Sequence, residues 1–444
     1  MRLTTLLSLA LWTAPSPALA EAPDLPRQAL LRFQLEARNR KLVVRSVDDR
    51  SPAARAGLRV GDALRTVNGT PYGKPYEGRD LLRRLDGGFK AVLEVDRAGR
   101  RQTVRFTPEP KPLEDLDGFD TQFGVVRAPG ALLRTYVSTP TPPAPRRPSI
   151  FFIQWVSCDT IEASPSSPSF AMLLDVARRA NMTLLRVERS SNGDSEGPAC
   201  HNLDLEGEVA QYQAAFDHLV EHRWVDPDQV VVWASSLGSF LAPFVVQGRR
   251  VAGVTVHGGG AVTYLERMIT FDRIRLERST FDPRAIQEEI TRRIDFHRQY
   301  LLESRDPEEI EASHPDLKGV WDRMLGTGEG THYGRPYAYH RQAASKNVLS
   351  AWLDVAAPVL VQYGVFDQFE GPHGHRLIER MLNRIRPGQA TYVRHPNMGH
   401  SFNIYPNEYS AHEWDRDTRV SGAPLGAQAV LDWLHAHILR IHHE

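Results

Sequence analysis

The stretch Val231-Val-Trp-Ala-Ser-Ser-Leu-Gly-Ser-Phe240 (VVWASSLGSF) decides how the rest of the chain is interpreted. An apolar run rich in β-branched residues stops abruptly at small residues, which is typical of a buried strand that meets a tight turn. A serine held between a strand and a helix needs small residues two positions before and after it, so that the two elements can approach each other. Ser236 satisfies this requirement, because Ala234 precedes it and Gly238 follows it. Ser235 does not, because the residue two positions beyond it is a leucine.

The bulk composition is that of an ordinary globular protein. The chain has 444 residues, 41% of them hydrophobic and 24% charged, which is enough for a large core and more than one domain. Lys+Arg and Asp+Glu both number 54, so there is no basic surplus for nucleic acid or an anionic membrane. We therefore expect small molecules or peptides as partners and no nucleic acid.

No cofactor or metal is expected from the motifs. The sequence contains no phosphate loop, no dinucleotide fingerprint and no cluster with convincing metal-ligand spacing. The tail HAHILRIHHE (435–444) is interpreted as an amphipathic terminal helix with solvated histidines, and a metal role is the less favoured alternative.

The first twenty residues, MRLTTLLSLALWTAPSPALA (1–20), have the pattern of a secretory signal peptide. A charge at Arg2 precedes a short apolar core, and small residues lead to a cleavage position after Ala20. The alternative is a membrane anchor, but Pro15 and Pro17 interrupt the apolar stretch, which is short for a bilayer. We expect a secreted or periplasmic protein with no transmembrane segment after cleavage.

Two cysteines, Cys158 and Cys200, fit such a compartment. Two thiols sent to an oxidising space usually pair, so we expect a disulfide between them. Two separate buried thiols are the alternative.

A first domain is expected over residues 30–108. Its diagnostic run is VVRSVDDRSPAARAGLRVGDALRTVNGTPY (43–72). It contains a helix start, a helix end, a turn into a strand and a hairpin-type turn: Ser51-Pro52-Ala53-Ala54, Gly57-Leu58, Gly61-Asp62 and Asn68-Gly69. A second helix is expected over RDLLRRLDGG (79–88) and a closing strand pair around Ala98-Gly99. This pattern resembles a PDZ domain of the type attached to bacterial exported proteases.

The PDZ resemblance implies a small β-rich domain that adds a peptide strand to a sheet edge and holds its terminal carboxylate with backbone N–H groups. The carboxylate loop should lie near LLRFQLE (30–36), which lacks the glycine that such loops usually use. The alternative is a domain that only packs on, or shields, the rest of the chain.

A second domain is expected over residues 118–444, after the polar linker PEPKPLEDLDG (108–118). FGVVRAPGALLRTYV (123–137) predicts a β-hairpin, and strands then alternate with amphipathic helices as in α/β proteins. The expected elements are strand 149–156, helix 169–180, strand 182–188, helix 203–222 and strands 229–235, 251–258, 357–367 and 390–400. Ser236 then falls at the carboxyl end of a central strand of a doubly wound sheet, where such sheets place their sites.

This order, together with the Ser236 turn and the loop Gly193-Asp-Ser-Glu-Gly197, resembles the α/β-hydrolases of the prolyl oligopeptidase-like group. The resemblance implies a serine nucleophile, then an acid, then a histidine along the chain. Asp367 follows an apolar strand, and His400 stands in Gly-His-Ser-Phe after the last strand. We expect Ser236, Asp367 and His400 to form the catalytic triad. Three neighbours are less favoured alternatives for the acid or the base: Glu370, His373 and His395.

Oxyanion donors are expected at the N–H of Leu237 and at one N–H of QWVSC (154–158), from Trp155 or Val156. Glycine is usual at this position, so the tryptophan is a departure from the family pattern. A Cys158–Cys200 bridge would hold this loop in place. The run HGGG (257–260) follows the nucleophile instead of preceding it, and is interpreted as a flexible strand end.

A charged segment with helical spacing, residues 260–350, is expected to form a lid over the site. A solvated helical insertion is the alternative. The aromatic run THYGRPYAYH (331–340) is expected to line the pocket.

The sequence thus predicts an exported serine hydrolase that cleaves an ester or a peptide bond of a small substrate. The competing hypothesis is a PDZ-containing binding or adaptor protein whose hydrolase-like domain no longer turns over.

Overall fold

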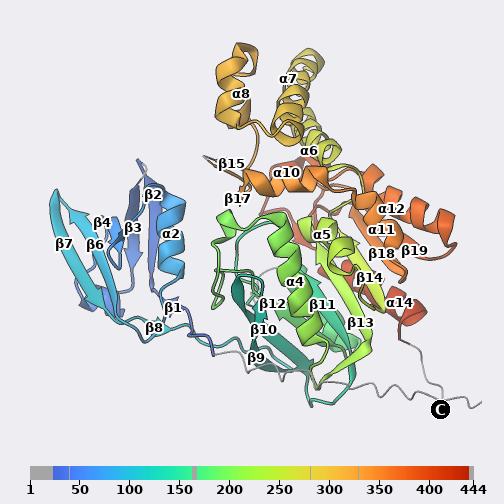
Figure 1. Cartoon of the computed structure of the whole chain (residues 1–444), viewed down its shortest axis with the longest axis horizontal. Helices are drawn as coiled ribbons and strands as arrows, with labels where there is room; N and C mark the ends of the chain where they lie inside the picture. Colours follow the sequence, from blue (N-terminus) through green and yellow to red (C-terminus); the bar gives the residue numbers. More distant parts are fainter. Residues whose placement is uncertain (1–23, 40, 163–167, 281, 329, 440–444) are drawn as a thin grey trace, which may run out of the picture.

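The computed structural model describes residues 24–439 apart from positions 40, 163–167, 281 and 329. The predicted signal segment and the last histidines of the tail lie outside these residues. Figure 1 shows a small β-rich lobe, joined by two extended segments to a larger lobe with a twisted sheet at its centre.

The small lobe contains residues 33–106. Its sheet has the order β2-β3-β4-β6-β7, with β5 paired to β4. The strands are β2 (Phe33–Arg38), β3 (Lys41–Val47), β4 (Ala63–Val67), β5 (Thr70–Pro71), β6 (Ala91–Arg97) and β7 (Arg100–Phe106). The strand pair around Ala98-Gly99 lies as the sequence predicts.

Two helices complete this lobe. Helix α1 (Pro52–Arg55) begins after Ser51, whose Oγ accepts a hydrogen bond from the Ala54 N–H at 3.1 Å. Helix α2 (Pro75–Arg83) begins earlier than the predicted 79–88 and ends before its last residues. Proline suits the first helical turn, and the Glu77 carboxylate accepts from the Lys74 N–H at 3.0 Å, so the helix can start there.

The connection between the lobes is more ordered than a polar linker implies. Strand β1 (Ala29–Leu30) pairs with β8 (Glu109–Pro110). Next to it, the buried Asp194 carboxylate accepts from Arg27 at 2.5 Å and from Arg134 at 3.1 Å. The Gly193–Gly197 loop therefore anchors the interdomain segment.

The large lobe is built on an eight-stranded sheet of order β19-β18-β14-β13-β11-β12-β10-β9. Its strands are β9 (Phe119–Ala128), β10 (Ala131–Pro140), β11 (Arg147–Ile153), β12 (Thr183–Val187), β13 (Val225–Ser235), β14 (Gly253–His257), β18 (Val359–Gly364) and β19 (Ala390–His395). β9 and β10 form the predicted antiparallel hairpin, and β10 also pairs antiparallel with β12. From β12 across to β19 all strands of the sheet are parallel to one another. The predicted α/β doubly wound fold is confirmed.

Both faces of this sheet are covered, which explains why its strands are apolar without alternation. Along β13, Val230 and Val232 enter one core while Val231 and Trp233 enter the other. The first core faces α4 (Leu205–Leu219), α5 (Leu237–Val245), α11 (Val348–Asp354) and α12 (Pro372–Ile385). The second faces α3 (Pro168–Arg179) and α14 (Ala423–His437).

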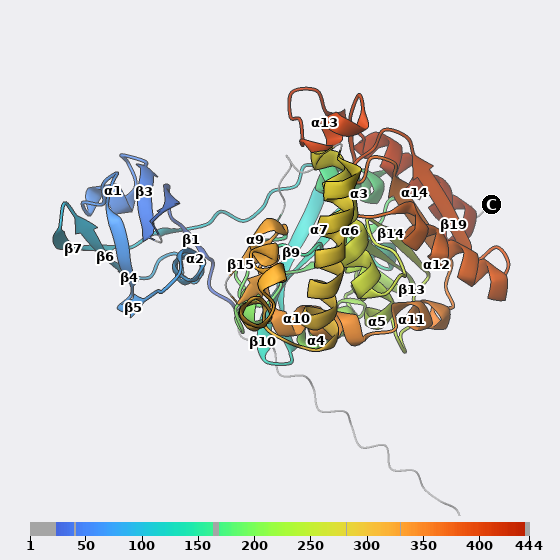
Figure 2. The same ribbon diagram turned by 90° about the horizontal axis from the view of Figure 1, so that it is seen from above.

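A largely helical insertion follows β14 and lies over one edge of the sheet, where Figure 1 shows α7 and α8 projecting from the body. It contains α6 (Tyr264–Ser279), α7 (Pro283–His297), a π-helical turn (Arg298–Leu302), α8 (Pro307–Ser313), α9 (Val320–Arg323) and α10 (Tyr337–Ser345). Three short strands, β15 (Thr327–Gly328), β16 (Thr331–His332) and β17 (Arg335–Pro336), form a small sheet before α10. In Figure 2, α6 and α7 cross the large lobe, and α13 (Glu408–His412) stands out at its rim.

Candidate active site

Ser236 lies at the junction of β13 and α5. Its φ of 53° and ψ of −121° are strained for a residue with a side chain. The Ser236 N–H donates to the His257 carbonyl at 2.8 Å and so ties the turn to the next strand. The strand-to-helix turn predicted from the sequence is therefore present.

Gly238 explains why small residues flank the serine. A Cβ at this position would lie 2.5 Å from the Ile153 carbonyl oxygen and 2.7 Å from that of Gln154. The start of α5 passes so close to the end of β11 that no side chain fits. Ala234, on the other side of the turn, is fully buried.

A continuous chain of hydrogen bonds leads from Ser236 into the protein. His400 Nε2 lies 2.9 Å from Ser236 Oγ, and His400 Nδ1 lies 2.8 Å from Asp367 Oδ2. Asp367 Oδ1 also accepts from the N–H groups of Phe369 at 2.8 Å and Glu370 at 2.9 Å. The structure thus brings together the three residues that the sequence nominates.

The alternative acid and bases have other partners or positions. Glu370 pairs with Arg267. His395, at the end of β19, lies 2.9 Å from the side-chain oxygen of Gln362 through its Nε2. His373 lies in the first turn of α12.

The charges along this series of hydrogen bonds favour a histidine that can act as a base. Burial opposes the charged form of His400, but the Asp367 carboxylate outweighs it and raises the pKa of the imidazole. Burial likewise opposes ionisation of Asp367, but His400 and the two N–H donors lower the pKa of that carboxyl. An ionised aspartate therefore stands ready to stabilise an imidazolium.

A second serine–histidine pair lies directly beside the first, and the sequence analysis did not find it. Ser235 Oγ is 2.9 Å from His257 Nε2, and both residues are buried. The His257 ring packs edge-on against Phe402 at 4.3 Å, and no described atom is a partner for its Nδ1. Burial, with the nearby His400 second, lowers the pKa of His257 well below its usual range.

A pocket of about 550 Å³ opens onto Ser236, Leu237 and His400. Its walls are mainly aromatic and aliphatic and include Trp155, Tyr264, Met268, Phe271, Tyr333 and Phe369. Several of these side chains come from the helical insertion. The expectation that the whole run 331–340 lines the pocket is wrong, because only Tyr333 of its described residues does so, whereas His332, Tyr339 and His340 are buried inside the insertion.

Three backbone N–H groups at the pocket are available to a ligand. Among the described residues, no atom accepts a hydrogen bond from the N–H of Trp155, Val156 or Leu237. Leu237 is the first residue of α5, where the helix leaves its N–H groups without intrahelical acceptors. All three residues line the pocket.

The glycines of HGGG allow neighbouring segments to pack closely. We therefore interpret them as packing residues and not as a flexible strand end. The strand β14 ends at His257 as expected. A Cβ at Gly258 would lie 2.6 Å from His400 Cε1, one at Gly259 2.8 Å from the Ser236 carbonyl oxygen, and one at Gly260 2.4 Å from the backbone of Gly374.

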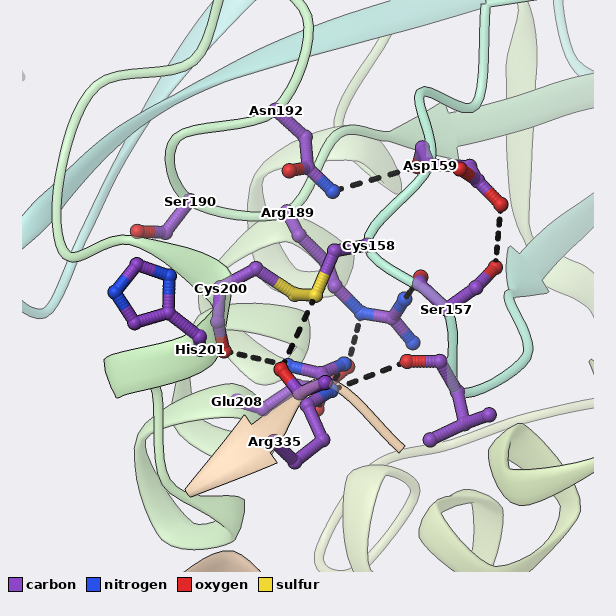
Figure 3. Close-up of a disulfide and its surroundings, with 12 residues drawn as sticks. Ser157, Cys158, Asp159, Arg189, Ser190, Asn192, Cys200, His201, Glu208 and Arg335 are labelled. Carbon is purple, nitrogen blue, oxygen red and sulfur yellow. Dashed lines mark hydrogen bonds and ion pairs between the residues drawn. A yellow bond between two sulfur atoms is a disulfide. The ribbon is translucent and has the colours of Figure 1, made fainter. Parts of the chain in front are cut away.

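Cys158 and Cys200 form a disulfide, shown in Figure 3, with Cα atoms 5.8 Å apart. Cys158 follows the loop that carries Trp155 and Val156, and Cys200 begins a short 3₁₀ helix. The bridge thus fastens the pocket wall to the segment before α4. On the other side of this segment, His201 Nδ1 lies 2.6 Å from Asp80 of α2 in the small lobe.

In the described part of the chain, no group of three or more His, Cys, Asp and Glu side chains could hold a metal ion. Nor does any described helix combine the length and apolarity that crossing a bilayer requires.

Family models match both lobes. A model described as the alpha/beta hydrolase family matches residues 163–412, more than half of the chain, and a PDZ domain model matches residues 43–97.

Curated relatives match only a short region. The chain is 40% identical over 75 residues to a probable periplasmic serine endoprotease DegP-like of Pseudomonas fluorescens, which is 17% of this chain and 16% of that protein. A protein of the same description from Pseudomonas putida is 36% identical over 85 residues, 19% of this chain and 18% of that protein. The chain therefore spans less than a fifth of the length of these relatives.

Similar solved structures include Est1E from Butyrivibrio proteoclasticus with bound ferulic acid. The two chains are 13% identical with a TM-score of 0.46, and the match covers 71% of this chain and 99% of Est1E. A thermostable esterase from Pseudomonas putida is 15% identical with a TM-score of 0.42, covering 74% of this chain and 86% of that one.

Proposed function

The chain belongs to the alpha/beta hydrolase family and carries a PDZ domain, and from this premise we propose that it is a serine hydrolase that cleaves an ester or a peptide bond through Ser236. One observation carries the proposal: the hydrogen-bond chain from Ser236 through His400 to the buried Asp367 begins in an apolar pocket of about 550 Å³.

In the proposed mechanism, Ser236 Oγ attacks the carbonyl carbon of the substrate while His400 Nε2 takes the hydroxyl proton. Asp367 accepts the hydrogen bond from Nδ1–H, which fixes the tautomer and stabilises the imidazolium. The imidazolium then gives its proton to the leaving alcohol or amine, and an acyl-serine forms. A water molecule, activated by the same histidine, hydrolyses the acyl-serine and restores the hydroxyl.

The negative charge on the carbonyl oxygen needs N–H donors in the transition state. The Leu237 N–H lies next to the nucleophile and has no other described acceptor, so we assign it as one donor. The second is the N–H of Trp155 or Val156, which also line the pocket.

We infer that the substrate is a small molecule with an apolar acyl group. A volume of about 550 Å³ is that of a small-molecule site. The carboxylate of Glu370 in the wall is paired with Arg267, so it does not favour a cationic substrate. Burial raises the pKa of the neighbouring Tyr264 to about 12, which keeps its hydroxyl neutral.

Labelling with a fluorophosphonate probe tests the proposal on the full chain. An activated Ser236 should react covalently, and Ser236→Ala should abolish the label while Ser235→Ala retains it. A folded wild-type chain that does not react would contradict the proposal and support the adaptor hypothesis. A panel of acyl esters and aminoacyl amides then separates esterase from peptidase activity.

We infer export to the periplasm or beyond the cell. The disulfide and the description of the PDZ-region relatives as periplasmic support this inference. Cell fractionation, with mass measurement of non-reduced peptides, should find the chain outside the cytoplasm, without residues 1–20, and with Cys158 joined to Cys200.

A peptide ligand of the PDZ domain would pair with β2, which is the edge strand of its sheet beside α2. The Arg79 side chain of α2 already donates to the Leu35 carbonyl of this strand at 3.4 Å. An incoming strand would have to displace that contact, so we expect Arg79→Ala to strengthen peptide binding in a calorimetric titration with C-terminal peptides.

A further inference from the structure

Three buried charged side chains surround the loop that carries Trp155 and Val156, and the mechanism above does not use them. Arg189 follows β12, Glu208 lies on α4, and Arg335 begins β17 of the insertion. They are 3%, 1% and 0% exposed. Both guanidinium groups donate to the same carboxylate oxygen, Glu208 Oε1. Arg189 donates through Nε, and Arg335 donates through Nη2 at 3.2 Å. Figure 3 shows this arrangement beside the disulfide.

Other donors of the two arginines point at the loop. Arg189 donates through Nη1 to the Ser157 carbonyl at 2.6 Å and through Nη2 to the carbonyls of Trp155 and, at 3.3 Å, Gln154. Arg335 donates through Nε to the Val156 carbonyl at 3.1 Å. Four consecutive carbonyl groups, those of residues 154–157, are therefore held by two fixed cations.

The direction of a carbonyl fixes the direction of the next N–H. In a planar trans peptide the C=O of one residue and the N–H of the following residue point in opposite directions. The carbonyls of Gln154 and Trp155 both accept from Arg189, so the N–H groups of Trp155 and Val156 point away from that guanidinium. These are the two groups that have no other described acceptor, and both residues line the pocket. Arg335 holds the Val156 carbonyl and so fixes the next peptide, on the other side of Val156.

We propose that Arg189 and Arg335, held together by Glu208, are positioning residues that aim the N–H groups of Trp155 and Val156 at the oxyanion of the transition state. This inference rests on the proposed function. It also gives a physical reason for the missing glycine: the loop does not need glycine's freedom, because the peptide orientations are imposed from outside by hydrogen bonds to charged donors.

The ion pair is suited to this task because all three side chains are buried and one carboxylate holds both guanidinium groups. Burial alone would raise the pKa of Glu208, but Arg189 and Arg335 outweigh it, so the pKa is lowered and the carboxylate stays charged. Arg335 also donates to the Cys200 carbonyl at 3.4 Å, and its guanidinium stacks over Tyr339 at 4.9 Å. The disulfide and the arginines thus hold the loop from two sides.

Arg335→Lys tests the proposal, with Arg186→Lys as the matched control. Lysine keeps the charge next to Glu208, but one ammonium cannot reproduce the fork that reaches Val156, Cys200 and Glu208 together. Arg186 is also 0% exposed and pairs with a glutamate. It donates to a backbone carbonyl, that of Ile161, and stacks over Tyr136 at 4.8 Å, but it does not contact residues 154–157.

The measurement is kcat and KM on a reactive ester, per mole of folded protein, together with inhibition by an arylboronic acid, which forms a tetrahedral adduct with the serine. For Arg335→Lys we expect kcat to fall about 10- to 100-fold with KM within about twofold, and boronate affinity to fall by the same factor as kcat. Arg186→Lys should lose folding stability but keep kcat and boronate affinity. If Arg335→Lys does not fold, Arg189→Lys carries the same expectation.

Two results would overturn the inference. One is an Arg335→Lys enzyme with unchanged kcat and unchanged boronate affinity. The other is an equal loss in Arg335→Lys and Arg186→Lys that follows the loss of folded protein, which would make the arginines purely structural. An inactive, unlabelled wild-type chain is a different failure, because it removes the proposed function itself before any variant is compared.

Discussion

Two serine–histidine pairs lie side by side at the carboxyl edge of the large sheet, and only one of them has the surroundings expected of a catalytic site. Ser236 and His400 are 2.9 Å apart, and so are Ser235 and His257. Distance therefore does not separate them.

What separates the pairs is the environment of each histidine. His400 has an ionised carboxylate on its second nitrogen, which raises its pKa, whereas His257 has no described partner there and burial lowers its pKa. A hydroxyl can give its proton only to a base that can hold it. The comparison teaches that the third residue, more than the serine–histidine contact, creates the base.

The backbone makes the second difference. Ser236 occupies the strained turn and is followed at once by the free N–H of Leu237, whereas Ser235 is the last residue of a regular strand. In the proposed mechanism, attack by Ser236 places the developing oxyanion beside this donor.

The largest effect is expected from a substitution that removes the serine of the Ser236–His400 pair. Ser236→Ala removes the attacking oxygen and leaves the fold, so kcat/KM on an ester should fall about 10⁵- to 10⁶-fold. Steady-state kinetics with circular dichroism as the folding control measures this. A variant that keeps wild-type turnover would move the nucleophile elsewhere.

The next test removes the carboxylate beside His400, so that His400, like His257, has no charged partner on its second nitrogen. Asp367→Asn keeps the shape but removes the charge that supports the imidazolium, so kcat should fall about 10³- to 10⁴-fold. The pKa of His400 should fall as well, and the acid limb of the pH–rate profile should move to lower pH. A profile that does not move would show that another carboxylate supports the base.

The pH dependence of the wild-type enzyme sharpens the comparison further. The proton acceptor must be neutral, so kcat/KM should fall about tenfold per pH unit below the pKa of His400. Because Asp367 raises that pKa, the inflection should lie above the ordinary value for histidine. An inflection below that value would assign the titration to a histidine whose pKa is lowered by burial, such as His257.

The smallest expected effect concerns the second pair. Ser235→Ala removes the partner of His257 Nε2 and should lower the free energy of unfolding by about 1–2 kcal/mol. The value of kcat/KM should stay within about threefold of wild type. Thermal unfolding and kinetics on one preparation distinguish the two effects, and a loss of activity above tenfold would give the Ser235–His257 pair a role in turnover.

The doubly wound sheet, the small residues around Ser236 and the order serine, aspartate, histidine could all be predicted without coordinates. The sheet and the small residues rest on local patterns: apolar runs of strand length, turn residues, and side chains that must be small where strand and helix touch. The order of the three site residues is what the resemblance to α/β-hydrolases implies. The structure agrees with these predictions at β13, α5 and the ends of β18 and β19.

Other features were decided by the tertiary structure alone. Arg335 is 179 positions from Val156, so no local pattern relates these two residues. Contacts between distant segments also decide three other features. These are the Ser235–His257 pair, the pairing of β1 with β8, and the position of Tyr333 in the pocket wall. Periodicity specifies which face of an element is buried, but which charges and N–H groups meet there is settled only when the whole sheet and its insertion pack together.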